Sequence, residues 1–396
     1  MTEKEIIGAL AKGKPFDGLP GVRVTSVREV PSIGPAIEDG RTVPNRWRLS
    51  AFPDVTLELQ FGENKVTVYA EVKNSCTPKL AEQIAPWLAS LKQARKDAAV
   101  ALICPVLSPE TQAIFDENDV DFIDLAGNVS VNVPGRFLLR RTGLKGKGTR
   151  PSSYRDPFSG SASRVVRVFL QKPREWTMSG IAQELASESR QRPFGIETFA
   201  VSPSSISKTL RALEEELLVR RRGLKVLVPE PRRLLIRWAE KYKERYRGYL
   251  RQSFKVTNRF GIDLKALTDD LRNAFMGFVL TGAAAASVVA PFVDIETIEV
   301  YLSDPSTRYA GKDFDDSKRL LQSAFSVGGP PPDVGPECRV VRPYDAGVFM
   351  YSKLQDEIPV VSDIQLFLDL YARGGRDLKQ AEYLLAKVIG PRWEHL

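Results

Sequence analysis

Histidine is almost absent from this chain of 396 residues, because the only one is His395, next to the last residue. Chain ends usually fray, so we do not expect this imidazole to serve an active site. Catalysis by a Ser-His-Asp or Cys-His arrangement, and zinc sites with histidine ligands, would lack their central residue. Any chemistry would therefore depend on carboxylates, lysine and a hard metal ion.

Cysteine pairs and long apolar runs are also missing. The three cysteines, Cys76, Cys104 and Cys338, lie far apart without a Cys-x-x-Cys pair, which favours buried, reduced thiols over zinc or redox roles. No stretch approaches the ~18 consecutive apolar residues that a membrane span needs. The N-terminal residues lack the basic and apolar regions of a signal peptide. We expect a cytoplasmic protein with no membrane partner.

Positive charge is concentrated in one segment of the chain. The net charge is +8, and residues 143–235 hold 18 Lys and Arg against 9 Asp and Glu, whereas the remainder holds 39 against 40. Local charge of this kind attracts a polyanion, although a solvated basic surface without a partner would have the same composition. The segment 143–235 is therefore the first candidate for nucleic-acid binding.

The length of the chain predicts two or three folding units. Residues 143–162 are rich in Gly, Ser, Pro and positive charge and show almost no apolar periodicity, which is typical of a linker. We predict an N-terminal domain at 1–142, a linker at 143–162, a central domain at 163–231 and a C-terminal domain at 232–396. The predicted fold class is a multidomain α/β protein.

The N-terminal domain has the pattern of a mixed sheet with helices. Residues 56–61 and 65–72 are apolar or alternate around a Gly-Glu-Asn turn, which predicts a hairpin. Apolar residues at helical spacing predict a helix at 78–94, and a second helix at 108–117 begins with Ser108 as N-cap before a proline. Strands are expected at 98–104 and 121–125, so strands and helices alternate along this part of the chain.

The central domain has the sequence pattern of a winged helix-turn-helix. Helices are expected at 163–170 and 179–189, and a third at 203–217 begins with Ser202 as N-cap and Pro203 at its first position. The apolar stripe of this third helix consists of Ile206, Leu210, Leu213 and Leu217. Two short apolar strands around a basic glycine turn would then form the wing.

Short hydroxyls and cations lie on the face of the third helix that is opposite the apolar stripe. Recognition helices present such side chains to base edges and phosphates in the major groove. We therefore predict that the chain binds double-stranded DNA, and the alternative is a winged helix that contacts only protein. The predicted DNA-binding residues are Ser204, Ser205, Lys208, Arg211, Arg220, Arg221, Arg222 and Lys225.

The N-terminal domain contains the spacing of the PD-(D/E)xK nucleases. Asp54 follows a proline, and Glu71 and Lys73 stand two residues apart at the end of an expected strand, so they share one face. In that chemistry Asp54 and Glu71 bind Mg²⁺, which activates water, and Lys73 orients the nucleophile. Asp54, Glu71 and Lys73 are therefore catalytic candidates in a restriction-endonuclease-like fold. A degenerate domain of this fold, which binds without cleaving and needs no metal, is the alternative that we favour.

The C-terminal domain resembles the nucleotidyltransferase fold in its order of strand, glycine, helix and strand, from about 275 to 303. Active members place a serine after the glycine and two carboxylates on the next strand. Here Ala283 replaces the serine, and Glu299 is the only carboxylate of the Glu299-Val300-Tyr301 triplet. We predict an inactive, pseudo-nucleotidyltransferase domain.

Several short motifs resemble the AbiEi-type antitoxins of type IV toxin–antitoxin systems. They are the stretches FIDLAGN (122–128), LTGAAAA (280–286), VVSDIQLFLDL (360–370) and AEYLLAKVI (381–389). The resemblance covers most of residues 50–390 and implies a bacterial regulator that represses its own operon. It also implies a C-terminal domain that counters a nucleotidyltransferase-like toxin. The chain departs from the simplest members by its long N-terminal domain.

Three functional hypotheses follow from the sequence. The first is a transcriptional regulator of AbiEi type that needs no cofactor and that acts on DNA alone or as a homodimer. The second is a Mg²⁺-dependent DNA endonuclease targeted by the winged helix. The third is a scaffold that neutralises a toxin and binds DNA only incidentally.

Overall fold

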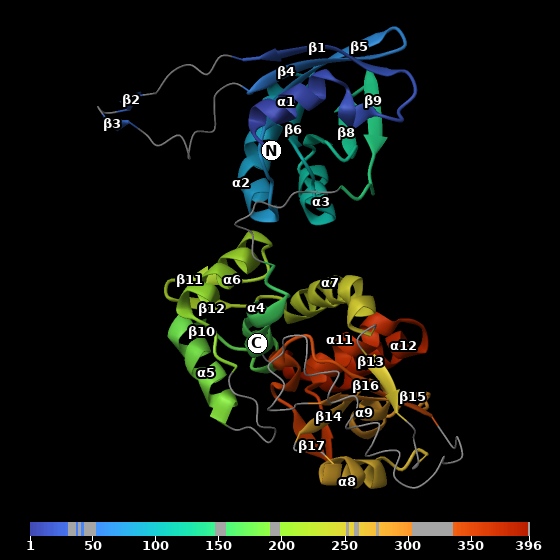
Figure 1. Cartoon of the computed structure of the whole chain (residues 1–396). Helices are drawn as coiled ribbons and strands as arrows, with labels where there is room; N and C mark the ends of the chain where they lie inside the picture. Colours follow the sequence, from blue (N-terminus) through green and yellow to red (C-terminus); the bar gives the residue numbers. More distant parts are fainter. Residues whose placement is uncertain are drawn as a thin grey trace. The chain divides into compact units, whose positions relative to one another are not determined.

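The computed structural model of the chain describes ten stretches, which are residues 1–30, 37–38, 41–42, 53–146, 156–190, 199–250, 253–256, 261–274, 277–302 and 336–394. The chain forms two compact units, Met1–Tyr154 with Glu215–Leu217, and Arg155–Glu214 with Leu218–Leu396. Both units combine helices with strands, which confirms the predicted mixed α/β class (Figure 1). Within the described stretches, no helix has the length and apolar character needed to cross a membrane.

The first unit is built on a seven-stranded mixed sheet. In spatial order its strands are β1 (Val22–Glu29), β4 (Val55–Phe61), β5 (Asn64–Val72), β6 (Ala99–Cys104), β7 (Asp121–Asp124), β8 (Val129–Val133) and β9 (Phe137–Arg141). The neighbours β5, β6 and β7 run parallel, and the other neighbouring pairs are antiparallel. A separate two-stranded ribbon pairs β2 (Ile37–Glu38) with β3 (Arg41–Thr42). The predicted hairpin at 56–72 is confirmed as β4 and β5.

Helices cover both faces of this sheet (Figure 1). The helices α2 (Pro78–Ala94) and α3 (Pro109–Glu117) pack on one face, and α1 (Glu3–Ala11) and a short 3-10 turn, η1 (Lys14–Phe16), pack on the other. Every residue of β6 is buried, as expected for a short apolar strand between two helical layers. The expected strand, helix, strand, helix and strand order from β5 to β7 is therefore present.

The second unit begins with three helices and a small antiparallel sheet. The helices are α4 (Gly160–Gln171), α5 (Met178–Arg190) and α6 (Pro203–Glu215), and the sheet consists of β10 (Trp176–Thr177), β12 (Lys225–Leu227) and β11 (Arg220–Arg222) in that order. The predicted end of the third helix at 217 is wrong, because Leu217 has a φ of 56° and α6 ends at Glu215. The predicted basic turn is also wrong, because the three arginines form β11 itself. The turn is Gly223-Leu224, where Gly223 has the positive φ (59°) that a two-residue hairpin needs.

A second, larger sheet follows in the same unit. Its strands lie in the order β13 (Ser253–Val256), β16 (Glu337–Val341), β15 (Thr297–Leu302), β14 (Phe278–Thr281), β18 (Ile358–Val360) and β17 (Lys353–Gln355). The helical elements are α7 (Pro231–Leu250), α8 (Leu264–Ala274), α9 (Gly282–Val289), η3 (Ala346–Phe349), α11 (Asp363–Arg373), α12 (Gly375–Leu384), η4 (Leu385–Ile389) and η5 (Gly390–Arg392). The predicted strand–glycine–helix–strand order is confirmed by β14, α9 and β15.

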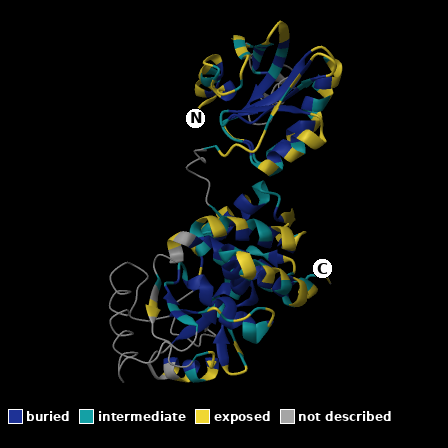
Figure 2. Cartoon of the chain, turned by 90° about the vertical axis from the view of Figure 1, so that its right-hand side faces the viewer, coloured by how far each residue is buried: buried dark blue, intermediate teal, exposed yellow. Residues whose placement is uncertain are grey.

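One hydrophobic core runs through the whole second unit, from Phe158 to Ile389. Its centre includes Trp238 of α7, which is fully buried, lies 6.4 Å from the ring of Phe158 and faces the guanidinium of Arg167 at 4.9 Å. Figure 2 shows this continuous buried interior. The boundary predicted at residues 231 and 232 therefore falls at the start of a helix that packs within a single core.

Candidate nucleic-acid interface

The start of α6 is set by a serine cap. The backbone N–H of Ser205 donates to the Ser202 hydroxyl at 3.2 Å, and the N–H of Ile206 donates to the Ser202 carbonyl at 2.9 Å. This is the N-cap geometry that the sequence predicts, with Pro203 at the first helical position. Ile206, Leu210 and Leu213 are fully buried. The cap and the apolar stripe together decide which face of α6 points outward.

The outward face of α6 carries the predicted hydroxyls and cations. Ser204, Lys208 and Arg211 are exposed and Ser205 is half-buried. The Ser205 hydroxyl accepts a hydrogen bond from Ser202 at 3.0 Å, so this side chain takes part in the cap. In the described part of the chain, Lys208 and Arg211 have no acidic side chain within ion-pair distance. The helix therefore presents two outward positive charges that no described carboxylate pairs with.

The hairpin of β11 and β12 carries the other four predicted cations. Arg220, Arg221, Arg222 and Lys225 are all exposed, and Leu224 at the turn is 87% exposed. Arg221 lies 3.7 Å from Glu214, a residue of α6. Arg222 and Lys225 both contact the carboxylate of Glu175. The hairpin thus projects cations, and several of them have acidic neighbours that the sequence did not reveal.

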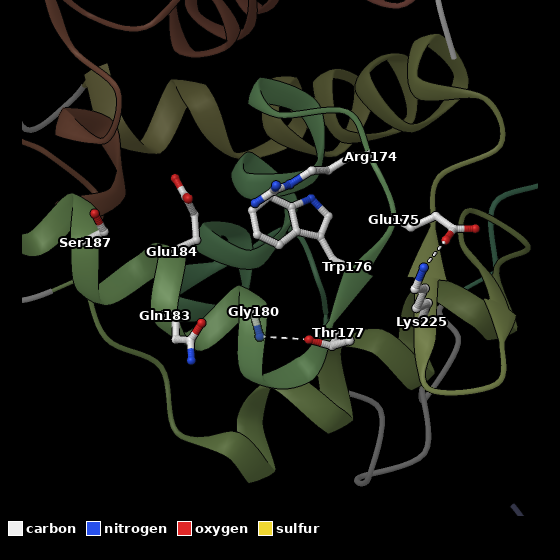
Figure 3. Close-up of a pocket in the computed structure, with 9 residues that line it drawn as sticks. All are labelled: Arg174, Glu175, Trp176, Thr177, Gly180, Gln183, Glu184, Ser187 and Lys225. Carbon is white, nitrogen blue, oxygen red and sulfur yellow. Dashed lines mark hydrogen bonds and ion pairs between the residues drawn. The ribbon is translucent and has the colours of Figure 1, made fainter.

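Glu175, which directly precedes β10, was missed in the sequence. Its carboxylate contacts Lys225 Nζ at 3.0 Å and Arg222 Nη1 at 3.7 Å. Glu175 and Lys225 line a pocket of about 390 Å³ between β10, β12 and α5 (Figure 3). In this pocket the Arg174 guanidinium lies 3.9 Å above the ring of Trp176. A sequence pattern could not signal these pairs, because 50 residues separate Glu175 from Lys225.

The structure brings the three catalytic candidates of the first unit together. Lys73 Nζ forms a hydrogen bond with Glu71 and lies 3.9 Å from Asp54 Oδ2, which also accepts the backbone N–H of Val72 at 2.9 Å. Val55 pairs with Ala70 across the antiparallel strands, so Asp54 stands beside Glu71 at the strand ends. The Glu71 side chain is only 4% exposed, compared with 37% for Asp54. This arrangement is a carboxylate–lysine cluster at the edge where β5 ends.

The donor set of this cluster limits the metal that it could hold. Among the described residues there is no group of three or more His, Cys, Asp or Glu side chains placed to bind a metal ion. Asp54 and Glu71 provide two carboxylates, which is a set that Mg²⁺ accepts when water and substrate phosphate supply its other ligands. The residues therefore fit Mg²⁺ bound together with a phosphate better than a permanently held ion.

The predicted pseudo-active site of the C-terminal region is filled by an internal ion pair. Glu299 on β15 is fully buried and is bound by the Arg373 guanidinium from α11. Burial raises the pKa of Glu299, and the nearby charge of Arg373 opposes that rise. A Cβ atom at Gly282 would lie 2.9 Å from the Glu299 carboxylate, so the glycine is needed for this close approach. The carboxylate is thus occupied by Arg373, and Ala283 is buried beside it.

Comparisons of the chain with protein-family models, with curated proteins and with solved structures gave no match. Two groups of described residues are the candidate sites of this chain. They are the exposed cations of α6 and of the β11–β12 hairpin, and the carboxylate–lysine cluster of Asp54, Glu71 and Lys73.

Proposed function

We propose that this chain is a DNA-binding transcriptional regulator whose residues 163–231 form a winged helix-turn-helix. The order α4, β10, α5, α6, β11, β12, with an antiparallel sheet that joins β10 to the final hairpin, supports this assignment. In this proposal α6 is the recognition helix and the β11–β12 hairpin is the wing. The observation that carries it is the outward pair Lys208 and Arg211, opposite the buried stripe of α6, neither of which is ion-paired with a described residue.

The dimensions of α6 suit the major groove of DNA. Its 13 residues span about 20 Å at the usual helical rise, and the groove is wide enough to admit such a helix. Arginine and lysine bind guanine edges and phosphates, and serine hydroxyls bind either, so the exposed side chains have the required chemistry. The cations of the wing would contact the flanking phosphates, which provide affinity without sequence preference.

We further propose that the regulator is an AbiEi-type antitoxin that represses its own operon. The sequence resemblance suggests this class, and the internal Glu299–Arg373 ion pair supports a C-terminal region that binds a partner rather than transfers nucleotides. Its partner would be a nucleotidyltransferase-like toxin. Co-expression with the product of the neighbouring gene, followed by size-exclusion chromatography, tests this part; separate elution of the two proteins would contradict it. The same column gives the oligomeric state and so tests a homodimer.

DNA binding itself is tested with the full-length protein. We expect repeated selection from a random duplex library to enrich one motif, and fluorescence anisotropy to show affinity for it that falls steeply with salt. A protein that enriches no sequence and binds no duplex at low salt would refute the proposed regulator.

The wing should determine how strongly the affinity depends on salt. Arg220→Gln combined with Arg222→Gln removes up to two phosphate contacts, and each contact contributes about 0.9 to the slope of log K against log salt. We therefore expect a slope that is less steep by up to about 2, with the same selected motif. Anisotropy titrations between low and moderate salt measure this slope, and an unchanged slope would exclude the wing from the interface.

A second candidate function is a Mg²⁺-dependent phosphodiesterase in the first unit. The observation that favours it is the convergence of Asp54, Glu71 and Lys73, which are separated by up to 19 positions in the chain. Asp54 and Glu71 would hold Mg²⁺, which supplies an activated water when bound. The Lys73 ammonium, within reach of both carboxylates, would offset charge on the attacked phosphate and orient the nucleophile.

Glu71→Ala is expected to abolish cleavage if this second function is present. The wild-type protein would convert supercoiled plasmid to nicked or linear DNA in Mg²⁺ or Mn²⁺, and the variant would lose about a hundredfold or more of that rate, as expected when a metal ligand is removed. Glu58→Ala on the adjacent strand β4 is the matched control and should retain activity. If the wild-type protein leaves the plasmid intact, or if Glu71→Ala cleaves it equally well, the proposed catalysis by this cluster is contradicted. The domain would then bind without cleaving.

A further inference from the structure

Arg222 and Lys225 lie on opposite strands of the wing and share one acidic partner. They are paired in register at the end of the hairpin, and Glu175 contacts both cations, Lys225 at 3.0 Å and Arg222 at 3.7 Å. The two cations are 65% and 60% exposed, so the solvent side of this arrangement is open. A single carboxylate therefore bridges two cations that project from the molecular surface.

Glu175 is held in this place by its neighbours. The next residue, Trp176, is buried, and its indole N–H donates to the carbonyl of Lys172 at 3.0 Å. Trp176 is also paired with Val226 across the sheet, and Thr177 is paired with Lys225. Figure 3 shows the Glu175 carboxylate directed at Lys225 on the adjacent strand. The pairing of β10 with β12 therefore places Glu175 beside Lys225 and Arg222.

We propose that Arg222 and Lys225 form a binding site for a DNA backbone phosphate, and that Glu175 occupies this site in the free protein as an internal competitor. A carboxylate and a phosphate diester both present anionic oxygens to ammonium and guanidinium donors. DNA would therefore have to displace Glu175 before the two cations reach a phosphate. The inference rests on the proposed DNA-binding function and adds a regulation of affinity at the wing.

Three other cations of the proposed interface lack such a competitor in the part of the chain that the structure describes. In the described residues, Lys208, Arg211 and Arg220 have no carboxylate partner, whereas Arg221 has Glu214 at 3.7 Å. The cations of α6 would thus contact DNA without first having to leave a carboxylate. Arg222 and Lys225 would contact a phosphate only after Glu175 has been released. The competitor lowers the affinity of the wing for any duplex, whatever its sequence.

Glu175→Gln tests the proposal, because it removes the competing charge and keeps the size of the side chain. We expect the full-length variant to bind a random-sequence duplex of 24 base pairs about threefold more tightly at low salt. The slope of log K against log salt should stay nearly the same, because the same phosphate contacts form in both proteins once Glu175 has been displaced. Glu175→Asp, which is too short to bridge both cations, provides a second variant and should show part of the gain.

Two controls separate competition from simple loss of negative charge. Glu230→Gln removes the same charge from an exposed carboxylate, 66% exposed and 3.8 Å from Arg233, and should change the affinity little. In a background with Arg222→Met and Lys225→Met, Glu175→Gln should have no effect. Equal effects of the Glu175 and Glu230 variants, or an undiminished effect in that background, would overturn the proposal. A wild-type protein that binds no DNA would instead refute the proposed function itself.

Discussion

Replacing Lys208, Arg211 and Arg221 together with alanine is expected to lower the affinity for the selected DNA site by about a hundredfold or more. Each cation that reaches a base edge contributes about 1–3 kcal/mol, and each 1.4 kcal/mol is a tenfold change in Kd. Among the described residues, Lys208 and Arg211 have no acidic side chain within ion-pair distance, so neither has to leave a carboxylate before it contacts DNA. Gel-shift and anisotropy titrations at fixed salt measure the loss.

The matched control is a variant with the same change in net charge on surfaces outside this interface. Lys243, Lys379 and Lys387 are exposed and lie on α7, α12 and η4. Their combined replacement with alanine should change the affinity only slightly, by long-range electrostatics that salt screens. Equal losses in the two triple variants would show that net charge, and no particular surface, drives binding. An undiminished affinity of the first variant would remove α6 from the interface.

Arg373→Met is expected to lower the free energy of unfolding by about 3–5 kcal/mol, because it leaves the buried Glu299 without its partner. Urea unfolding followed by circular dichroism measures this loss. Replacing both residues, as Arg373→Met with Glu299→Gln, should recover much of it, since no charge is then left buried. A single variant as stable as the wild type would show that the ion pair does not stabilise this region.

The stability deficit of Arg373→Met should also depend on pH. Burial raises the pKa of Glu299, and removal of Arg373 takes away the charge that opposes this rise. An acid whose pKa is higher in the folded state binds more protons when folded, so its folded state gains stability as the pH falls through that raised pKa. The deficit should therefore be largest at neutral pH and above, and should shrink toward the pKa of an unfolded glutamate, about 4.3. A deficit that grows on acidification would contradict this account.

Local sequence signals predicted many individual elements. The helix at 78–94 follows from apolar residues at helical spacing and has the predicted bounds, and Ser108 caps α3 as its position before a proline suggests. Ser202 caps α6 for the same reason. These signals succeed because capping and periodicity depend on residues a few positions apart.

Other elements had no such local signal. The strands β8 and β9 were not predicted, since each is five residues long and is stabilised by its neighbour in the sheet. The two-residue strand β10 exists only because Trp176 and Thr177 pair with β12. Three consecutive arginines would not be assigned to a strand by propensity, yet pairing with Lys225–Leu227 makes them β11. Tertiary pairing overrides weak local preference in each case.

The order of residues alone determined the mixed α/β class, the cationic face of α6 and the nuclease-like spacing that ends at Lys73, because each depends on composition or on periodicity along one element. Only the tertiary structure decided which charges meet. It places Asp54 beside Glu71 at the ends of two paired strands. It also pairs Arg222 and Lys225 with the carboxylate of Glu175, and the buried Glu299 with Arg373. Such encounters join residues that are far apart in the chain, and no spacing rule along the sequence encodes the distance between two side chains in space.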